Sequence, residues 1–221
     1  MAAGAYIFDA YGTLFDVHAA IAKYGDRIGE NAGRLSELWR SKQLEYTWTL
    51  SAMDRYEDFE RLTERALDFA LAKFPEADPA LKPALLAAYR ELDAFPDARA
   101  ALQSLKDAGA VTGILSNGSP EMLDAAIGAA KLAPLLDHVI SVDEIGIYKP
   151  RGEVYALVTE ALELKPEDIA FVSSNRWDVA GAANFGFTAI WVNRGKVPGE
   201  YQNLAPAFIV PDLQSLPDLD L

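Results

Sequence analysis

The sequence predicts an α/β protein with a doubly wound, mostly parallel sheet and an all-helical cap domain inserted after the first strand. From about residue 96 onward, short apolar runs alternate with helical patterns, which is typical of a parallel sheet wrapped by helices. Residues 16–95 instead carry helical patterns with no strand between them. We therefore expect a core formed by residues 1–15 and 96–221 and a cap formed by residues 16–95.

Each expected strand of the core is a short apolar run that stops at polar residues. The first run ends at Asp9, and the later runs are VTGILSN (111–117), HVISV (138–142), IAFVSSN (169–175) and TAIWVN (188–193). In open parallel sheets, ligands bind beyond the carboxyl ends of the strands. The polar residues at these ends should therefore converge on one crevice, with the cap closing over it.

The expected helices have apolar residues at three- and four-residue spacing. They cover residues 33–51, 56–74 and 79–95 in the cap and residues 97–109, 119–132, 151–164 and 176–186 in the core. Gly109 and Gly186 suit helix ends, and Pro120 and Pro166 suit helix starts. The tail, residues 211–221, is expected to run across the surface.

Composition and charge narrow the possible functions. The chain has 20 Lys and Arg against 33 Asp and Glu, so its formal net charge is -13. The electrostatic field of this negative charge repels phosphate, which argues against nucleic acid or an anionic membrane as a partner. A few local cations can still hold a small anionic substrate. With no cysteine in the chain, disulfides, zinc–thiolate sites and thiol catalysis are excluded. No signal peptide or membrane span is recognisable, so we expect a cytoplasmic protein.

Five motifs together resemble those of the L-2-haloacid dehalogenases of the haloacid dehalogenase superfamily. They are FDAYGTLFD, WRSKQLEYTW, ILSNGSPEML, YKPRGEVY and FVSSNRWDVAGAANFGF, and they extend over both core and cap. The resemblance implies a Rossmann-like core and the hydrolysis of L-2-haloalkanoic acids to D-2-hydroxy acids. It further implies a 2-haloacid and a halide ion as ligands, no cofactor, and a homodimer.

Asp9 is the expected nucleophile. A carboxylate that displaces a leaving group forms an ester, which splits a difficult hydrolysis into two easier steps. The alternative is an acidic residue that merely caps a turn at a strand end. By the resemblance, Thr13 hydrogen-bonds Asp9 or its turn, and Gly12 permits the sharp turn between them.

Tyr11 and the serines of the fourth strand both argue against phosphatase chemistry. Superfamily phosphatases carry a second Asp two residues after the nucleophile, where it protonates the leaving alcohol; a departing halide needs no proton. The phosphatases also hold magnesium with acidic residues after the fourth strand, whereas this chain has FVSSNRWD, with only Asp178 acidic. We therefore expect no metal ion. The alternative for Tyr11 is that it packs under the cap.

Four residues are expected to interact with charged groups. The resemblance implies that Lys149 lies next to Asp9 and keeps it ionised, that Arg40 receives the departing halide with help from Asn117, and that Ser116 binds the substrate carboxylate. Arg40 shares one face of its helix with residues 43, 44 and 47, a mixed polar and apolar face that suits a lid. From local sequence alone, both Arg40 and Lys149 equally fit solvated surface positions.

The remaining candidates form a polar network and an apolar pocket in the family that the chain resembles. The network consists of Tyr155, Ser173, Asn175 and Asp178, and the pocket includes Tyr11, Leu44, Phe59 and Trp177. Asp178 is the expected activator of the hydrolytic water, positioned by Ser173 and Asn175. A helix N-cap is the alternative for Asn175, and ordinary core packing is the alternative for the apolar residues.

Two other functions are weighed against the dehalogenase: a small-molecule phosphatase of the same superfamily, and a non-catalytic protein that retains the fold. The second should have lost some of the candidate residues, yet Asp9, Arg40, Lys149, Asn175 and Asp178 are all present. The motif residues set neither the chain length of the haloacid nor the halogen, fluoride included. No pattern in the sequence assigns a role to Arg176 or a physiological substrate to the protein.

Overall fold

The computed structural model describes residues 4–220, so the outermost residues of the expected segments 1–15 and 96–221 lie outside the described part. Its centre is a six-stranded parallel sheet with the order β3-β2-β1-β4-β5-β6. The strands are β1 (Ala5–Phe8), β2 (Val111–Ser116), β3 (His138–Ser141), β4 (Ile169–Ser173), β5 (Thr188–Val192) and β6 (Phe208–Val210). The chain builds outward from β1 in both directions, which confirms the doubly wound fold class.

The two strands that flank the centre of the sheet are apolar because both of their faces are covered. Every residue of β1 and of β4 is buried, as expected for parallel strands with helices on either side. The sequence analysis did not predict β6. That strand is only three residues long and lies at the sheet edge, where Ile209 is exposed, so it lacks a long apolar run.

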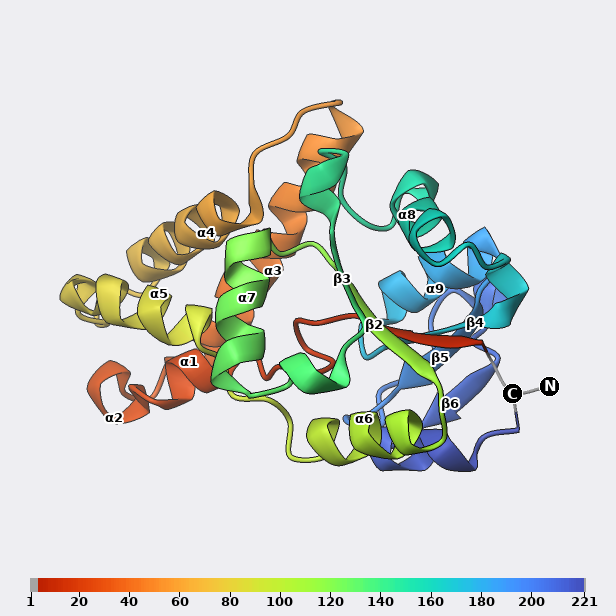
Figure 1. The fold of residues 1–221 in the computed structure, drawn as a ribbon. Coiled ribbons are helices and arrows are strands. Elements are labelled where there is room, and N and C mark those ends of the chain that lie inside the picture. The colour runs from red at the N-terminus through yellow and green to blue at the C-terminus, as the bar shows by residue number, and fades with distance from the viewer. Residues whose placement is uncertain (1–3, 221) are drawn as a thin grey trace.

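Four helices accompany the strands of the core (Figure 1). They are α6 (Ala98–Asp107), α7 (Pro120–Ala129), α8 (Gly152–Leu162) and α9 (Arg176–Phe185), and each lies within a predicted helical range. Gly109 and Gly186 follow their helices with φ of +82° and +112°, a backbone conformation that favours glycine. Pro166, predicted to start a helix, instead begins a single 3₁₀ turn, Pro166–Asp168.

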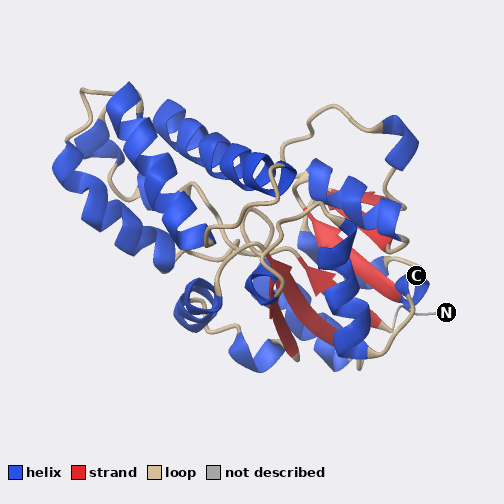
Figure 2. Ribbon diagram, turned by 90° about the horizontal axis from the view of Figure 1, so that it is seen from above, coloured by secondary structure: helices blue, strands red, loops and turns tan. Residues whose placement is uncertain are grey.

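A helical insertion, residues 16–95, separates β1 from α6 and lies to one side of the sheet (Figures 1 and 2). It contains α1 (Ala19–Ala22), α2 (Gly25–Ile28), α3 (Ala32–Ala52), α4 (Phe59–Lys73) and α5 (Lys82–Arg90). The short helices α1 and α2 were not predicted, because four residues are too few to show a helical period. Within residues 4–220, no helix is long and apolar enough to cross a membrane.

The predicted helix 79–95 is shorter than expected because its last residues form a connection to the core. Phe95 N donates to Leu14 O at 2.8 Å, and Asp16 N donates to Asp93 O at 2.9 Å. The chain therefore leaves and re-enters the core through two segments that lie side by side. Hydrogen bonding between these segments replaces the hydrogen bonds of another helical turn.

Most of the tail from residue 211 to 220 is exposed or half-buried, as predicted, but two of its leucines belong to the core. Leu213–Asp218 form a 3₁₀ helix that packs against α6, with Leu213 and Leu216 fully buried. Two residues three apart lie on the same side of a 3₁₀ helix, so both leucines face the core. Residue 221 lies outside the described part.

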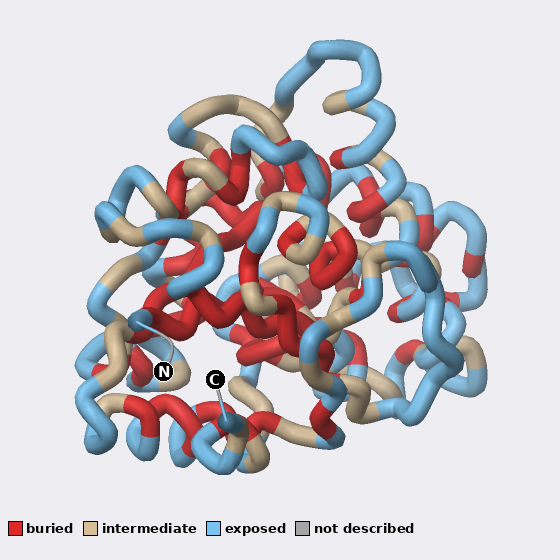
Figure 3. The backbone as a smooth tube through the Cα atoms, turned by 90° about the vertical axis from the view of Figure 1, so that its right-hand side faces the viewer, coloured by how far each residue is buried: buried red, intermediate tan, exposed pale blue. Residues whose placement is uncertain are grey.

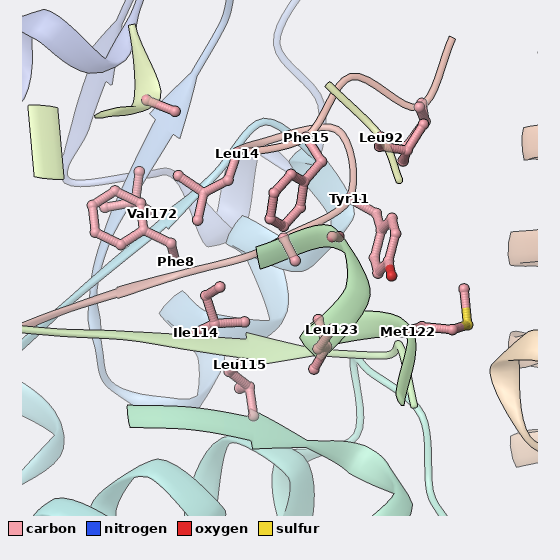
Figure 4. Close-up of a cluster of buried hydrophobic side chains, with 14 of the residues drawn as sticks. Phe8, Tyr11, Leu14, Phe15, Leu92, Ile114, Leu115, Met122, Leu123 and Val172 are labelled. Carbon is pink, nitrogen blue, oxygen red and sulfur yellow. The ribbon is translucent and has the colours of Figure 1, made fainter. Parts of the chain in front are cut away.

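Buried residues concentrate along the strands and the inner sides of the helices (Figure 3). Near the carboxyl end of β1, the core includes Phe8, Ile114 and Val172 from three neighbouring strands (Figure 4). Leu14 and Tyr11, from the loop after β1, join the same cluster. The loop that carries Asp9 is therefore anchored by apolar side chains on both sides of the carboxylate.

An ion pair fastens the connection between core and helical insertion. Arg194, just after β5, donates to both oxygens of Asp97 at 2.6 and 3.0 Å and to Thr13 O at 3.3 Å. Asp97 Oδ2 also accepts from Leu213 N at 2.8 Å. Burial alone would raise the pKa of Asp97, but the hydrogen bonds from Arg194 and Leu213 lower it below its ordinary value.

We expect Asp97→Asn to lower the free energy of unfolding by about 1–3 kcal/mol at pH 7, because the charge-assisted hydrogen bonds weaken. Since the pKa of Asp97 is lowered in the folded state, its contribution is present above the unfolded pKa of about 4 and is lost as pH falls through the folded value. Urea unfolding at pH 7 and pH 3 should therefore show the variant approaching the wild type at the lower pH. Asp26→Asn, at an exposed position, is the matched control, and an equal loss at both pH values would contradict the prediction.

Candidate active site

The carboxyl ends of β1, β2 and β4 bring the predicted polar residues to one edge of the sheet. Asp9 directly follows β1, and its backbone N–H extends the ladder to Val172 O at 2.9 Å. Ser116 ends β2, and Ser173 ends β4. All three of these polar residues are buried, as a functional crevice at this edge requires.

The two oxygens of the Asp9 carboxylate have different surroundings. Oδ2 accepts from Asn175 Nδ2 at 2.7 Å and from Thr13 Oγ1 at 3.1 Å, with Ser173 Oγ at 3.4 Å. Among the described residues, Oδ1 accepts only from Lys149 Nζ, at 3.1 Å. One oxygen is thus fixed by three donors, and the other retains a free lone pair beside a cation.

Lys149 lies beside Asp9, as the resemblance implies, and is not a solvated surface residue. Its side chain is fully buried, donates to Asp178 Oδ2 at 2.9 Å as well as to Asp9, and lies 4.9 Å from the centre of the Phe171 ring. Burial alone would lower the pKa of Lys149, but the charges of Asp178 and Asp9 raise it above its ordinary value. The side chain is therefore an ammonium at neutral pH.

Asp178, in the first turn of α9, is fully buried, and both of its oxygens are engaged. Oδ1 accepts from the Tyr155 hydroxyl at 2.7 Å, and Oδ2 accepts from Lys149. Burial raises the pKa of Asp178 to about 6, against the opposing effect of Lys149. Burial also raises the pKa of Tyr155 well above its ordinary value, so the phenol stays a donor to Asp178.

The donor set does not fit the magnesium ion that superfamily phosphatases hold. Lys149 Nζ lies between Asp9 and Asp178, at the position from which a divalent cation would bridge two carboxylates. Within residues 4–220, no group of three or more His, Asp or Glu side chains could hold a metal ion. A hard cation prefers several oxygen ligands, and here both carboxylates already share an ammonium.

Asn175 precedes α9 at the N-cap position, but its side chain makes no capping hydrogen bond. Instead, its Nδ2 donates to Asp9 and, at 3.2 Å, to Tyr11 O. The capping alternative for Asn175 is therefore wrong. Its backbone N donates to Ser173 Oγ at 3.1 Å, so Ser173 and Asn175 hold each other in place around the carboxylate.

The loop after β1 is shaped by Gly12 and Thr13. Gly12 has a φ of +95°, a region that an L side chain rarely adopts, so the predicted sharp turn is present. Thr13 Oγ1 accepts from Ser174 N at 2.8 Å while it donates to Asp9. The hydroxyl of Thr13 therefore connects the loop after β1 to the end of β4.

Arg40 reaches from α3 to the loop after β1 and is not a surface arginine. Its Nη2 donates to Tyr11 O at 3.0 Å, and its Nη1 donates to Gln43 Oε1 at 2.7 Å. Gln43 Oε1 also accepts from the Tyr89 hydroxyl of α5 at 3.1 Å, and its Nε2 donates to Thr63 of α4. Residues from α3, α4 and α5 of the insertion therefore fix the orientation of the Arg40 guanidinium.

Ser116 and Asn117 have partners of their own in the loop after β2. Ser116 Oγ accepts from Gly118 N at 3.0 Å, and Asn117 Oδ1 accepts from Lys149 N at 3.1 Å. Asn117 therefore positions the backbone of Lys149 directly. The next residues lead into α7, where Ser119 Oγ caps the helix by accepting from Met122 N, as expected for a serine at this position.

Tyr11 does pack under the helical insertion. Its ring stacks on Tyr89 at a centroid distance of 5.8 Å and contacts Phe59 at the same distance, in the cluster drawn in Figure 4. A Cβ atom at Gly118 would lie 2.6 Å from this ring, so a glycine is needed there. Burial raises the pKa of Tyr11, and its buried hydroxyl has no hydrogen-bond partner among the described residues.

The other three predicted pocket residues, Leu44, Phe59 and Trp177, come from α3, α4 and α9. Leu44 and Phe59 are buried, and Phe59 contacts both Tyr11 and Tyr148. Trp177 meets Trp48 of α3 edge-on at 5.4 Å. Trp177 and Tyr148 also line a cavity of about 380 Å³.

Three residues of the site were not singled out from the sequence: Gln43, Tyr89 and Tyr148. Gln43 shares a helix face with Arg40, so its spacing from Arg40 could have indicated that it belongs to the site. Tyr148 precedes Lys149, and its backbone N and hydroxyl bond to the insertion at Ser51 Oγ and Glu57 O. Nothing in the sequence around Tyr89 indicates that it belongs to the site, because its role arises from contacts between helices that are distant in sequence.

Comparison with known proteins agrees with this geometry. Residues 4–186 match the haloacid dehalogenase-like hydrolase family. (S)-2-haloacid dehalogenase 1 of Pseudomonas sp. strain CBS-3 is 49% identical, over 97% of this chain and 95% of the relative. (S)-2-haloacid dehalogenase 4A of Burkholderia cepacia is 48% identical, over 90% of this chain and 86% of the relative.

Solved structures agree as well. A dehalogenase crystal structure superposes with a TM-score of 0.95 at 45% identity, covering 98% of this chain and 97% of that one. The L-2-haloacid dehalogenase of Xanthobacter autotrophicus with chloropropionic acid covalently bound superposes with a TM-score of 0.89 at 38% identity, covering 99% and 98%. The chain belongs to the haloacid dehalogenase-like hydrolase family and, within it, to the (S)-2-haloacid dehalogenases.

Proposed function

We propose that the protein hydrolyses L-2-haloalkanoic acids to D-2-hydroxy acids through an ester formed on Asp9. The observation that carries this proposal is the asymmetry of the Asp9 carboxylate. Three donors fix Oδ2, whereas Oδ1 faces only the Lys149 ammonium among the described residues. The covalently bound chloropropionic acid of the Xanthobacter autotrophicus enzyme supports a covalent intermediate.

In the first step, Asp9 Oδ1 attacks C2 of the substrate from the side opposite the halogen. The C–O bond forms as the carbon–halogen bond breaks, the halide departs with the electron pair, and the configuration at C2 inverts. Arg40 offers its guanidinium to the halide, while Ser116 and the neighbouring amides bind the substrate carboxylate. The leaving group needs no proton, which suits a buried Tyr11 with a raised pKa.

In the second step, water attacks the Asp9 carboxyl carbon. Asp178 takes one proton of this water. The bond between the carboxyl carbon and Oδ1 then breaks, Asp178 returns the proton to Oδ1, which leaves as the hydroxyl oxygen of the product, and the regenerated Asp9 releases the second proton to solvent. As the tetrahedral intermediate forms, negative charge develops on Oδ2, where Asn175, Thr13 and Ser173 already donate. Hydrogen-bond donors that already point at the oxygen where negative charge develops stabilise the transition state and so accelerate the reaction.

The helical insertion, residues 16–95, acts in this proposal as the cap domain, with 1–15 and 96–221 as the core. Arg40, Leu44 and Phe59 come from the insertion, whereas Asp9 and Lys149 come from the core. Closing the two parts together would exclude water and strengthen the electrostatic interactions inside. The expected homodimer and cytoplasmic location stay predictions.

Halide release from each enantiomer of 2-chloropropionate, measured with EDTA present, tests this function. We expect chloride from the L form alone and D-lactate as the product. No release from either enantiomer, together with magnesium-dependent cleavage of p-nitrophenyl phosphate, would instead support the phosphatase alternative. Fluoroacetate then tests whether fluoride can be released.

The pH dependence of kcat follows from the role proposed for Asp178. Its pKa is raised to about 6, so lowering the pH through this value protonates the base and slows hydrolysis of the ester. We expect kcat to fall below about pH 6 and the ester on Asp9 to accumulate, as detected by mass spectrometry after an acid quench. A flat kcat profile down to pH 4.5 would contradict the role of Asp178.

A further inference from the structure

An apolar cavity lies where α3 meets the core, next to Lys149. Its walls include Trp48 from α3, Trp177 from α9, Tyr148 and Lys149. Two residues belong both to the cavity wall and to the site: Lys149, whose ammonium is bonded to Asp9, and Trp177. The cavity volume of about 380 Å³ is large enough for a short alkyl chain.

Tyr201 contributes to the outer wall of this cavity from an otherwise exposed loop. Residues 195–203 are all exposed, and 47% of Tyr201 is accessible to solvent. Tyr201 also has a φ of +49°, a left-handed conformation uncommon for a bulky residue. Such a residue keeps its place only where neighbouring groups hold it.

Arg176 is the group that holds Tyr201. Its Nη2 donates to Tyr201 O at 3.0 Å and to Leu204 O at 2.8 Å. The guanidinium also lies 5.5 Å from the centre of the Tyr201 ring and 5.9 Å from that of Trp191. Arg176 thus binds the backbone of the loop and contacts the ring that faces the cavity.

The burial of Arg176 indicates that these contacts matter. The residue is only 6% exposed, and within the described part of the chain it forms no salt bridge. Burying a guanidinium is unfavourable unless other groups replace its hydration. Here the two loop carbonyls bonded to Nη2 and the two aromatic faces replace part of this hydration, while Nη1 has no hydrogen-bond partner among the described residues. The loop position follows from these contacts.

We propose that Tyr201, held in place by Arg176, forms the outer wall of the pocket for the alkyl chain and favours 2-haloacids with chains longer than propionate. This inference rests on the proposed function. The carboxylate and the halide stay with the polar groups around Asp9, so the part of the substrate left for the cavity is its aliphatic chain. Arg176 acts through Tyr201 and is a positioning residue.

The first experiment compares L-2-bromohexanoate with L-2-bromopropionate. Each methylene removed from water changes binding roughly fourfold. Tyr201→Ala should therefore lower the ratio of kcat/KM for the long to the short substrate by about tenfold, through a higher KM for the long substrate at little-changed kcat. An unchanged or increased ratio would overturn the proposal.

The second experiment tests the link to Arg176. Arg176→Ala should lower the same ratio, Arg176→Lys should restore part of it, and Arg176→Ala with Tyr201→Ala should fall no further than Tyr201→Ala alone. A lower melting temperature with an unchanged substrate ratio would show that Arg176 serves stability alone and overturn its positioning role. If Arg176→Ala does not fold, the comparison of Tyr201→Ala with wild type still tests the role of Tyr201.

Val197→Ala is the matched control. Val197 lies on the same loop and is 54% exposed, but does not line the cavity, so its substitution should leave the ratio unchanged. Failure of the proposed function looks different from failure of this inference. If the proposed function is wrong, wild-type enzyme releases no halide from either substrate. If only this inference is wrong, wild-type enzyme releases halide, and Tyr201→Ala leaves the ratio of kcat/KM for the long to the short substrate unchanged.

Discussion

Replacing Asp9 with asparagine is expected to stop halide release, with kcat lowered by about 10³-fold or more. The amide is nearly the same size as the carboxylate but is neutral and a poor nucleophile, so no ester can form at normal speed. Asn175, Thr13 and Ser173 all donate to Oδ2, and an amide oxygen can still accept these bonds. The loss should therefore appear in the chemical step rather than in folding.

Mass spectrometry separates the covalent mechanism from direct attack by water. Wild-type enzyme quenched with acid during turnover of L-2-bromopropionate should carry the 1-carboxyethyl group of the substrate, esterified to Asp9, on the peptide that contains Asp9, and Asp9→Asn should carry none. Asp16→Asn is the matched control, because Asp16 lies on the same loop and its carboxylate accepts only from His18 N among the described residues. Full halide release from Asp9→Asn whose asparagine is verified as intact would show that the ester mechanism is wrong.

The fold could be predicted because its signals are local and repeated. Apolar runs such as 169–175 alternate with helical segments, and buried parallel strands need apolar residues on both faces. The features that were missed depend on tertiary contacts. The strand β6 forms because Ile190 to Val192 offer it an edge, and Leu213 is buried because α6 covers it. Neither partner is near in sequence.

The site could be predicted only in part for the same reason. Strand ends located Asp9 and Ser173, but nothing near Lys149 in the sequence reveals that its partner stands 140 positions away. Local reasoning alone treats Lys149 and Arg40 as surface residues, and the motifs of the resembled family corrected this. Arg176 lies inside one of these motifs, but the motif assigned it no role, so its contact with Tyr201 could be found only in the structure.

Lys149→Met is expected to lower kcat by about 10³-fold or more, because Asp9 and Asp178 then share a buried site without the cation between them. Two neighbouring carboxylates cannot both stay ionised in such a place, so one of them takes up a proton. If Asp9 is protonated it cannot attack, and if Asp178 is protonated it cannot activate water. Methionine fills a similar volume, so the effect should come from the lost charge.

The stability of Lys149→Met should depend on pH with a definite sign. Removing one partner of a buried ion pair costs about 3–5 kcal/mol at pH 7. In the variant, the folded-state pKa of the carboxyl pair is raised, so the penalty is present at pH 7 and shrinks as the pH falls through that raised value. Urea unfolding at pH 7 and pH 5 should therefore show a smaller difference from wild type at pH 5.

Lys165→Met is the matched control, because Lys165 is exposed and its substitution should change neither kcat nor stability measurably. A Lys149→Met variant that behaves like this control would mean that Asp9 keeps its charge without the ammonium. The three donors on Oδ2 would then have to supply that stabilisation alone. The other outcome is that Lys149→Met loses activity while its difference in unfolding free energy from wild type is the same at pH 7 and pH 5. That result would show that Lys149 acts on the substrate rather than on the carboxyl pair. The two measurements together therefore assign the ammonium either to Asp9 and Asp178 or to the ligand.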